Sequence, residues 1–141
     1  MDKRSLSKME PSQVEYRRDD EPPAAIAKLG WRYHHIGIPT TVHRQGEKYI
    51  PRLKIYLQGF SSSPYGIEWM RFDPDCSLPE IIKTVPHVAF EVDDLEAALQ
   101  GREVISPPSS PSDGVSAAMI LHNGAPVELI TFHRKVPKDG A

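Results

Sequence analysis

The sequence predicts an α+β fold built from two small β-rich modules. Fourteen prolines and nine glycines fall mostly between short apolar runs, which argues against a mainly helical fold. The second half of the chain repeats the residue pattern of the first. Between two apolar runs, the pair Asn123-Gly124 is a strong signal for a two-residue hairpin turn. At 141 residues the chain is long enough for one domain or for two half-size modules that share a core.

Composition divides the chain into four parts. Residues 1–22 form an N-terminal extension rich in charges of both signs, which we expect to be loose. The first module follows as residues 23–84 and the second as residues 85–134. Residues 135–141 remain as a C-terminal tail.

The bulk properties exclude several classes of function. A net charge of -2 and a pI near 6.3 give no electrostatic basis for binding nucleic acid or an anionic membrane. The single cysteine, Cys76, cannot form an internal disulfide, and in its polar loop sequence we expect an incidental thiol. The sequence has no signal-peptide core and no run of about 18 apolar residues. We therefore expect a cytoplasmic protein.

Turn residues delimit the elements of the first module. Paired prolines at its start and a glycine at its end favour a short helix over residues 24–30. Apolar runs between turn residues predict three strands and then one or two helical turns: Tyr33–Pro39, Lys48–Leu57 and Ile67–Phe72 as the strands, and Ser77–Thr84 as the turns.

The second module has the clearest helix of the chain. An Asp at the start, good helix formers inside and a glycine at the end predict it over Leu95–Gly101. A strand over His87–Val92 precedes it, a short strand over Glu103–Ser106 follows it, and Pro107–Gly114 is expected to be a loop.

The last two strands meet at the hairpin turn, which determines their register. With Asn123-Gly124 as the two-residue loop, His122 pairs with Ala125. Met119 then lies directly across from Glu128, where it would line a pocket or pack in the core.

A His and a Glu occupy matching places in the two halves. His35 and His87 each stand at the head of a strand and are followed by apolar residues. Glu68 and Glu128 each lie in a closing strand of the pattern apolar-Glu-apolar-apolar-polar-Phe. The separation is 33 positions from His35 to Glu68 and 41 from His87 to Glu128. A duplication with one helix trimmed from the first module accounts for both the likeness and the difference of 8 residues.

These four side chains are a candidate metal site. Taken singly, a strand His is more often a core or edge residue than a ligand, and a strand Glu more often faces solvent. A Glu that faces the core carries a large desolvation cost unless a metal or a cation compensates it. When all four residues occupy matching places, a metal site is favoured over these structural roles. The sequence therefore predicts one divalent ion held by His35, Glu68, His87 and Glu128.

Other polar residues are expected to have structural roles. His34 should face away from His35 by strand alternation, and His43, His122 and His133 lie in or beside loops. Solvent exposure is favoured for three strand cations that could instead bind an anionic substrate group: Arg52, Lys54 and Arg71. Glu91 should share the inward face with His87 and could support a ligand.

Several segments resemble the vicinal oxygen chelate superfamily, which includes glyoxalase I, methylmalonyl-CoA epimerase, extradiol dioxygenases and bleomycin-resistance proteins. The resemblance covers about residues 31–133 and is carried by three segments: His35-Ile-Gly-Ile-Pro, His87-Val-Ala-Phe-Glu-Val-Asp-Asp-Leu-Glu-Ala-Ala-Leu and Gly124-Ala-Pro-Val-Glu128-Leu-Ile. It implies two βαβββ modules that form an open β-barrel around a central cleft. In this chain the first module departs from that pattern, because residues 40–47 stand where its helix would be.

The resemblance also implies a site and a chemistry. Ligands would come from the first and last strands of each module, which here are His35, Glu68, His87 and Glu128. Such a set suits Zn, Ni, Co, Mn or Fe, and could chelate two adjacent oxygens of a small substrate. The expected activity is that of a lyase or isomerase of the glyoxalase or epimerase type, which moves a proton through an enolate. Glu128 is the first choice for the base and Glu68 the second.

Two other functions stay open at this point. An extradiol-type Fe(II) dioxygenase would use two His and one Glu, which leaves Glu68 surplus. A non-enzymatic binder of small molecules would use aromatic lining, which four residues could supply: Trp31, Phe60, Tyr65 and Trp69. Barrels in this superfamily form within one chain or between two, so a homodimer is also expected.

Overall fold

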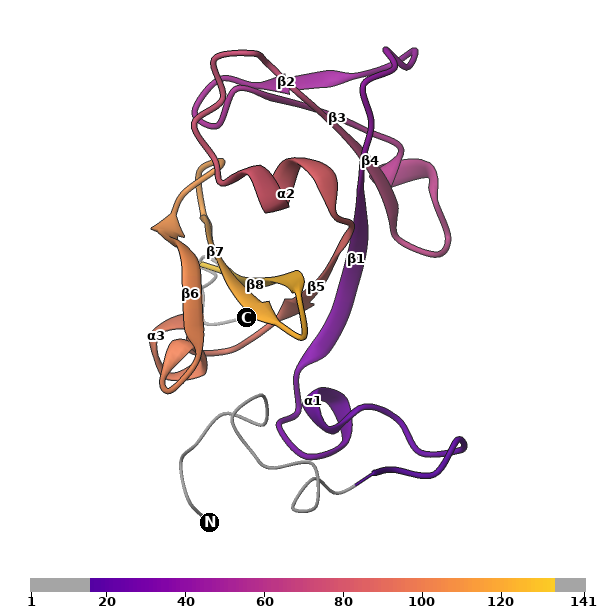
Figure 1. The fold of residues 1–141 in the computed structure, drawn as a ribbon, viewed down its shortest axis with the longest axis vertical. Coiled ribbons are helices and arrows are strands. Elements are labelled where there is room, and N and C mark those ends of the chain that lie inside the picture. The colour runs from indigo at the N-terminus through magenta and orange to yellow at the C-terminus, as the bar shows by residue number, and fades with distance from the viewer. Residues whose placement is uncertain (1–15, 134–141) are drawn as a thin grey trace, which may run out of the picture.

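A single curled sheet organises the computed structural model, which describes residues 16–133. Its eight strands follow the order β2-β3-β4-β1-β5-β8-β7-β6. In Figure 1 the strands surround the short helix α2, which contacts both β1 and β8. The elements in chain order are α1 (Ala24–Ala27), β1 (Arg32–Pro39), β2 (Lys48–Ile50), β3 (Ile55–Gln58), the 3-10 turn η3 (Phe60–Ser62), β4 (Ile67–Phe72), α2 (Glu80–Thr84), β5 (His87–Glu91), α3 (Leu95–Leu99), β6 (Glu103–Ser109), β7 (Val115–His122) and β8 (Ala125–Phe132).

The two halves of the sheet have matching topology. In each half the first strand pairs in parallel with the last, β1 with β4 and β5 with β8. The halves join through the antiparallel pair of β1 and β5 at the centre of the sheet. This arrangement confirms the predicted α+β fold with an open barrel.

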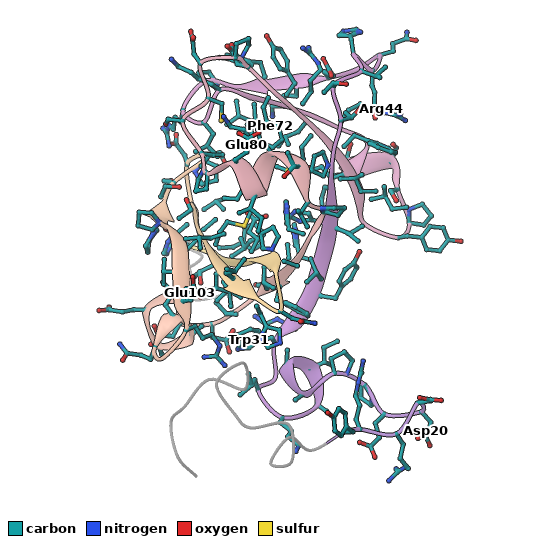
Figure 2. The ribbon with its side chains drawn as sticks, in the orientation of Figure 1. Asp20, Trp31, Arg44, Phe72, Glu80 and Glu103 are labelled. Atoms are coloured by element: carbon teal, nitrogen blue, oxygen red, sulfur yellow. The ribbon has the colours of Figure 1, made fainter. Side chains whose placement is uncertain are left out.

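A loop takes the place of the missing helix in the first half. No helix lies between β1 and β2 in this part of the described chain. Instead the guanidinium of Arg44, labelled in Figure 2, lies 4.5 Å from the ring centroid of Trp69. Arg71 donates two hydrogen bonds to Glu47, at 2.7 and 2.9 Å. Hydrogen bonding from Arg71 lowers the pKa of Glu47 to about 2, although burial opposes it. Both strand residues project from β4 on the face opposite to Glu68.

The outer face of the second half is covered by α3, which has the start that the sequence predicts. The carboxylate of Asp94 accepts a hydrogen bond from the backbone N–H of Ala97 at 3.0 Å. The helix ends at Leu99, two residues before the predicted glycine. It packs on a core cluster with members from both the helix and the sheet: Phe90, Val92, Ala98, Ile120 and Leu129.

The final hairpin forms in the predicted register. Asn123 and Gly124 have φ values of 49° and 76°, as a two-residue turn of the left-handed type requires. Met119 lies directly across from Glu128 and is 8% exposed, so it packs in the core.

Two strand predictions were wrong. The single strand predicted over residues 48–57 is split into β2 and β3, because the chain turns at Lys54, which has a φ of 57°. The loop predicted to start at Pro107 begins later, because β6 continues to Ser109. Since β6 is the last strand of the sheet, its prolines cost no ladder hydrogen bond on the free side.

The N-terminal region and Cys76 also differ from expectation. The first helix is shorter than predicted and ends at Ala27. Cys76 is 4% exposed and packs with Ile55 and Met70, so its side chain belongs to the core of the first half. Most of the predicted extension and all of the predicted tail lie outside the described residues. Among the residues that the structure describes, no helix combines the length and apolar character needed to cross a bilayer.

Candidate metal centre

Two rows of residues across the sheet position the four candidate ligands. In the first row His35 of β1 pairs with Ala89 of β5, which pairs with Glu128 of β8. In the second row Glu68 of β4 pairs with Gly37 of β1, which pairs with His87 of β5. Each row therefore has a Glu and a His separated by a small residue. The small central residues leave the space above the sheet to the longer side chains on either side.

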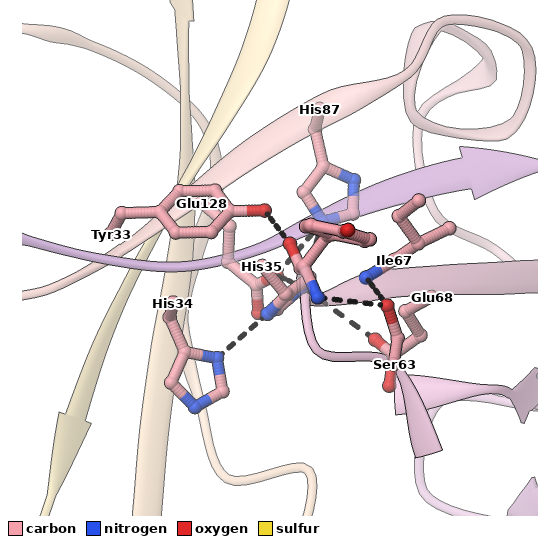
Figure 3. Close-up of polar contacts among 9 residues, drawn as sticks. Tyr33, His34, His35, Ser63, Ile67, Glu68, His87 and Glu128 are labelled. Carbon is pink, nitrogen blue, oxygen red and sulfur yellow. Dashed lines mark hydrogen bonds and ion pairs between the residues drawn. The ribbon is translucent and has the colours of Figure 1, made fainter. Parts of the chain in front are cut away.

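Three of the four side chains converge on one point (Figure 3). Ligand atoms of His35, His87 and Glu128 all lie within 4.8 Å of one another. The Oε1 atom of Glu128 lies 3.0 Å from Nε2 of His87 and 3.2 Å from Nε2 of His35. The two Nε2 atoms are 3.4 Å apart. Glu68 lies beside this cluster, with its Oε1 atom 3.5 Å from Nε2 of His35.

The cluster is buried but its carboxylates reach solvent. His35 and His87 are 5% and 1% exposed. The side chains of Glu68 and Glu128 are 14% and 17% exposed. The imidazoles are therefore the buried part of the cluster, and the two glutamate side chains are its more exposed part.

The surroundings shift the pKa values of the carboxylates in opposite directions. Burial raises the pKa of Glu68, and the nearby charge of Glu128 adds to this effect while His35 opposes it. Burial would also raise the pKa of Glu128, but hydrogen bonds from His35 and His87 outweigh it and lower that pKa to about 2. For His35, burial is outweighed by the bond and charge of Glu128, so its pKa is raised. In the metal-free chain Glu128 therefore stays ionised to a lower pH than Glu68.

The donor set fits one divalent ion. Imidazole and carboxylate ligands bind such ions at about 2.0–2.2 Å, so ligand atoms around one ion lie about 3 Å apart. The measured contacts of Glu128 with the two imidazoles, 3.0 and 3.2 Å, match this spacing. Two neutral imidazoles with one carboxylate suit zinc and other first-row metals. The described residues could therefore hold a metal here.

Gly37 makes room for His87. A Cβ atom built at Gly37 would lie 2.2 Å from Cε1 and 2.7 Å from Nε2 of His87, and 2.7 Å from Sδ of Met70. Real atoms do not approach so closely, so only glycine at position 37 leaves space for the His87 ring against the backbone of β1. No role for Gly37 was predicted from the sequence. The signal was present, since a glycine inside a strand marks the close approach of another group.

His87 is held by packing rather than by a hydrogen bond to its second nitrogen. Its Nδ1 atom is buried and has no hydrogen-bond partner among the described residues. The ring instead lies against Gly37, where a built Cβ would meet its Cε1 and Nε2 atoms. Packing thus orients this imidazole while leaving one polar atom unpaired.

The prediction that His34 faces away from His35 was wrong. The register between β1 and β5 shifts between Tyr33 and His35, which marks a β-bulge. A bulge interrupts strand alternation, so consecutive side chains can lie on one side. The Nδ1 atoms of His34 and His35 are 2.8 Å apart. Burial lowers the pKa of His34, and the neighbouring His35 adds to this effect.

Two open grooves flank the His34 ring. One, of about 570 Å³, is lined by Tyr33, Phe60, Tyr65 and neighbouring residues. The other, of about 660 Å³, is lined by Glu91, Phe132 and neighbouring residues. Of the four aromatic residues considered as lining, Phe60 and Tyr65 therefore border a groove. Two lie elsewhere: Trp31 packs on Phe90, and Trp69 lies under Arg44.

Two of the three cations considered for substrate binding, Arg52 and Arg71, are engaged elsewhere. Arg52 donates to the backbone carbonyl of Ser110 and to Asp113, at 3.1 and 2.9 Å. These contacts join the β2–β3 turn to the loop between β6 and β7. Arg71 is paired with Glu47 on the outer face. Glu91 lies 3.4 Å from Arg32 and borders the second groove.

Comparison with known proteins bears on the fold. No protein-family model matches the sequence, and no curated protein resembles it significantly. The structure is similar to that of a hypothetical protein from Bacillus halodurans C-125, with a TM-score of 0.57 and 17% identity over 77% of this chain and 99% of the other. At this level of identity the likeness shows a shared fold.

A second solved structure is similar at a lower level. It is the methylmalonyl-CoA epimerase from Mycobacterium tuberculosis, with a TM-score of 0.46, 19% identity, and coverage of 71% of this chain and 87% of the other. This likeness is too loose to bear on function. Within this fold, the two histidines of the cluster lie on β1 and β5, the strands that join the two halves.

Proposed function

We propose that this protein binds one divalent metal ion through His35, His87 and Glu128, with Glu68 beside it. We further propose that it acts as a lyase or isomerase on a small substrate with two adjacent oxygens. The convergence of three ligand atoms within 4.8 Å, from three different strands, is the observation that supports this proposal. The two modules, residues 23–84 and 85–134, would each contribute one His and one Glu.

The two carboxylates are suited to different roles. An ion at the cluster would polarise a substrate carbonyl and stabilise the negative charge that develops on its oxygen. Glu128 contacts both imidazoles, so its carboxylate would be held as a ligand. Glu68 has a longer contact of 3.5 Å and reaches solvent. Its carboxylate would take a proton from the carbon beside the carbonyl and return it, with Glu128 as the second choice for this step.

An extradiol-type Fe(II) dioxygenase is the second candidate. Two His and one carboxylate, with the second Glu set apart, is the donor set of many non-haem Fe(II) oxygenases. Oxygen consumption by the Fe(II)-loaded protein with a panel of catechols would favour this candidate. Deuterium exchange at a carbon beside a carbonyl, without oxygen uptake, would favour the lyase or isomerase.

Replacement of His87 by Ala tests the metal site itself. Wild-type protein purified without chelator should contain about one metal ion per chain by elemental analysis. His87→Ala should retain less than about a tenth of the wild-type metal content, because one of the buried ligands is lost. His122→Ala, at an exposed hairpin position, is the matched control and should keep its metal. Equal metal in His87→Ala and wild type would refute the site.

The proposal includes a cytoplasmic location and a homodimer. The absence of an internal disulfide, with one buried thiol in the described chain, is compatible with a reducing compartment. Light scattering during size-exclusion chromatography would measure the mass of the particle. A mass near 15.8 kDa at micromolar concentration would remove the dimer from the proposal.

A further inference from the structure

His34 and His35 form a hydrogen-bonded pair beside the metal cluster. Their Nδ1 atoms lie 2.8 Å apart, and Nε2 of His35 faces Glu128 at 3.2 Å (Figure 3). His35 therefore uses one ring nitrogen toward the cluster and the other toward His34. Neighbouring residues of a regular strand could not make this contact, and the β-bulge between Tyr33 and His35 permits it.

The ring of His34 is held in place by both halves of the barrel. It stacks on Phe60 with ring centroids 4.9 Å apart and planes inclined by 16°. It also packs against Phe132, with ring centroids 5.3 Å apart. Phe60 belongs to the first half and Phe132 to the last strand of the second. A ring that packs against two phenyl rings can present one nitrogen in a constant direction.

The chemistry of metal binding determines which nitrogen carries the proton. An imidazole that binds a metal through Nε2 keeps its single proton on Nδ1, and that N–H needs an acceptor. For His35 the acceptor within reach is Nδ1 of His34, whose own proton then resides on Nε2. The other candidate imidazole, His87, has no such partner among the described residues.

We propose that His34 is a positioning residue. Its Nδ1 atom accepts a hydrogen bond from the Nδ1–H group of His35, which directs the Nε2 lone pair of His35 toward the ion. This inference rests on the proposed function, because it assigns a partner to one of the proposed ligands. The two imidazoles of the cluster would then be oriented differently, His35 by a hydrogen bond and His87 by its packing on Gly37.

Two substitutions separate the hydrogen bond from the ring stacking. In His34→Phe an aromatic ring remains beside Phe60 and Phe132 but the hydrogen-bond acceptor is lost. In His34→Asn the ring is lost, while the side-chain oxygen, bonded to Cγ as Nδ1 is, keeps an acceptor near the same place. Zn²⁺ affinity is measured for both full-length variants by competition with a chromophoric chelator. His122→Phe is the control for adding a phenyl ring at an exposed histidine.

The expected order of affinity identifies the hydrogen bond as the cause. His34→Phe should bind Zn²⁺ about 10- to 100-fold more weakly than wild type, the usual cost of removing such a partner. His34→Asn should recover most of the loss, and His122→Phe should match wild type. Equal affinity of His34→Phe and wild type would overturn the inference while leaving the metal site intact. Failure of wild type itself to bind Zn²⁺ would instead overturn the proposed function.

Nitrogen NMR gives a readout that stacking alone would not change. In the Zn²⁺-loaded wild-type protein, the ¹⁵N shifts of His34 should show a proton on Nε2 and a bare Nδ1. Those of His35 should show a protonated Nδ1. A proton on Nδ1 of His34 in the loaded protein would contradict the proposed direction of the hydrogen bond.

Discussion

Gly37→Ala should abolish metal binding although it alters no ligand. The added methyl group would lie 2.2 Å from Cε1 of His87, so the imidazole must rotate away from the cluster or the strands must separate. Because His87 is 1% exposed, the core offers it little alternative space. We expect metal content to fall below about a tenth of the wild-type value, and the free energy of unfolding to fall by about 1–3 kcal/mol, as overpacked cores do. Elemental analysis and urea denaturation measure the two effects.

Gly46→Ala is the matched control for this experiment. Gly46 has a φ of 86° and no atom within 4 Å of a built Cβ. Its replacement by alanine should therefore lower the free energy of unfolding by a comparable amount, roughly 1–2 kcal/mol, through backbone strain. It should leave the metal site unchanged. If Gly37→Ala bound metal as fully as Gly46→Ala, the close packing of His87 on β1 would not matter for binding.

Glu128→Gln should remove a pH-dependent part of the stability of the metal-free protein. The folded pKa of Glu128 is about 2, compared with 4.5 for an unperturbed Glu. At about 1.4 kcal/mol per pH unit, this difference corresponds to about 3 kcal/mol of stability at neutral pH. A depressed carboxylate pKa stabilises the fold above pH 4.5, and the effect is lost as the pH falls toward 2. The raised pKa of His35 reflects the same contact and adds no separate stability.

Urea denaturation with EDTA present, at pH 7, 5 and 3.5, tests this expectation. The gap between wild type and Glu128→Gln should be about 3 kcal/mol at pH 7 and clearly smaller at pH 3.5. Glu96→Gln, in the first turn of α3, serves as the control for a carboxylate outside the cluster. A gap that stays constant with pH would mean that the charge of Glu128 does not stabilise the fold. The variant should also lose its metal, because an amide is a weak ligand in place of a carboxylate.

Local chemistry made several features predictable from sequence. The Asn123-Gly124 turn sets the pairing of β7 with β8 residue by residue, so the position of Met119 across from Glu128 followed from turn type alone. The capping Asp94 likewise marked the start of α3. The repeated His and Glu positions directed attention to four residues on the central strands, because matching places in two halves meet at the axis that relates them.

The features that were missed depend on neighbours far away in the chain. Strand alternation cannot reveal a bulge, so the contact between His34 and His35 was not expected. The continuation of β6 through Pro107 depends on its being an edge strand, which only the assembled sheet determines. The burial of Cys76 similarly reflects packing against Ile55 and Met70, which lie on separate strands.

The three converging side chains come from strands that lie far apart along the chain, β1, β5 and β8. An unfolded chain would not hold them together, so an ion bound there would favour the native state by mass action. At a free metal concentration 100 times the dissociation constant, this gain is about 2.7 kcal/mol. Resistance of the protein to proteolysis in the cell would then increase with the supply of the ion. The amount of the protein in the cell would therefore depend on metal availability.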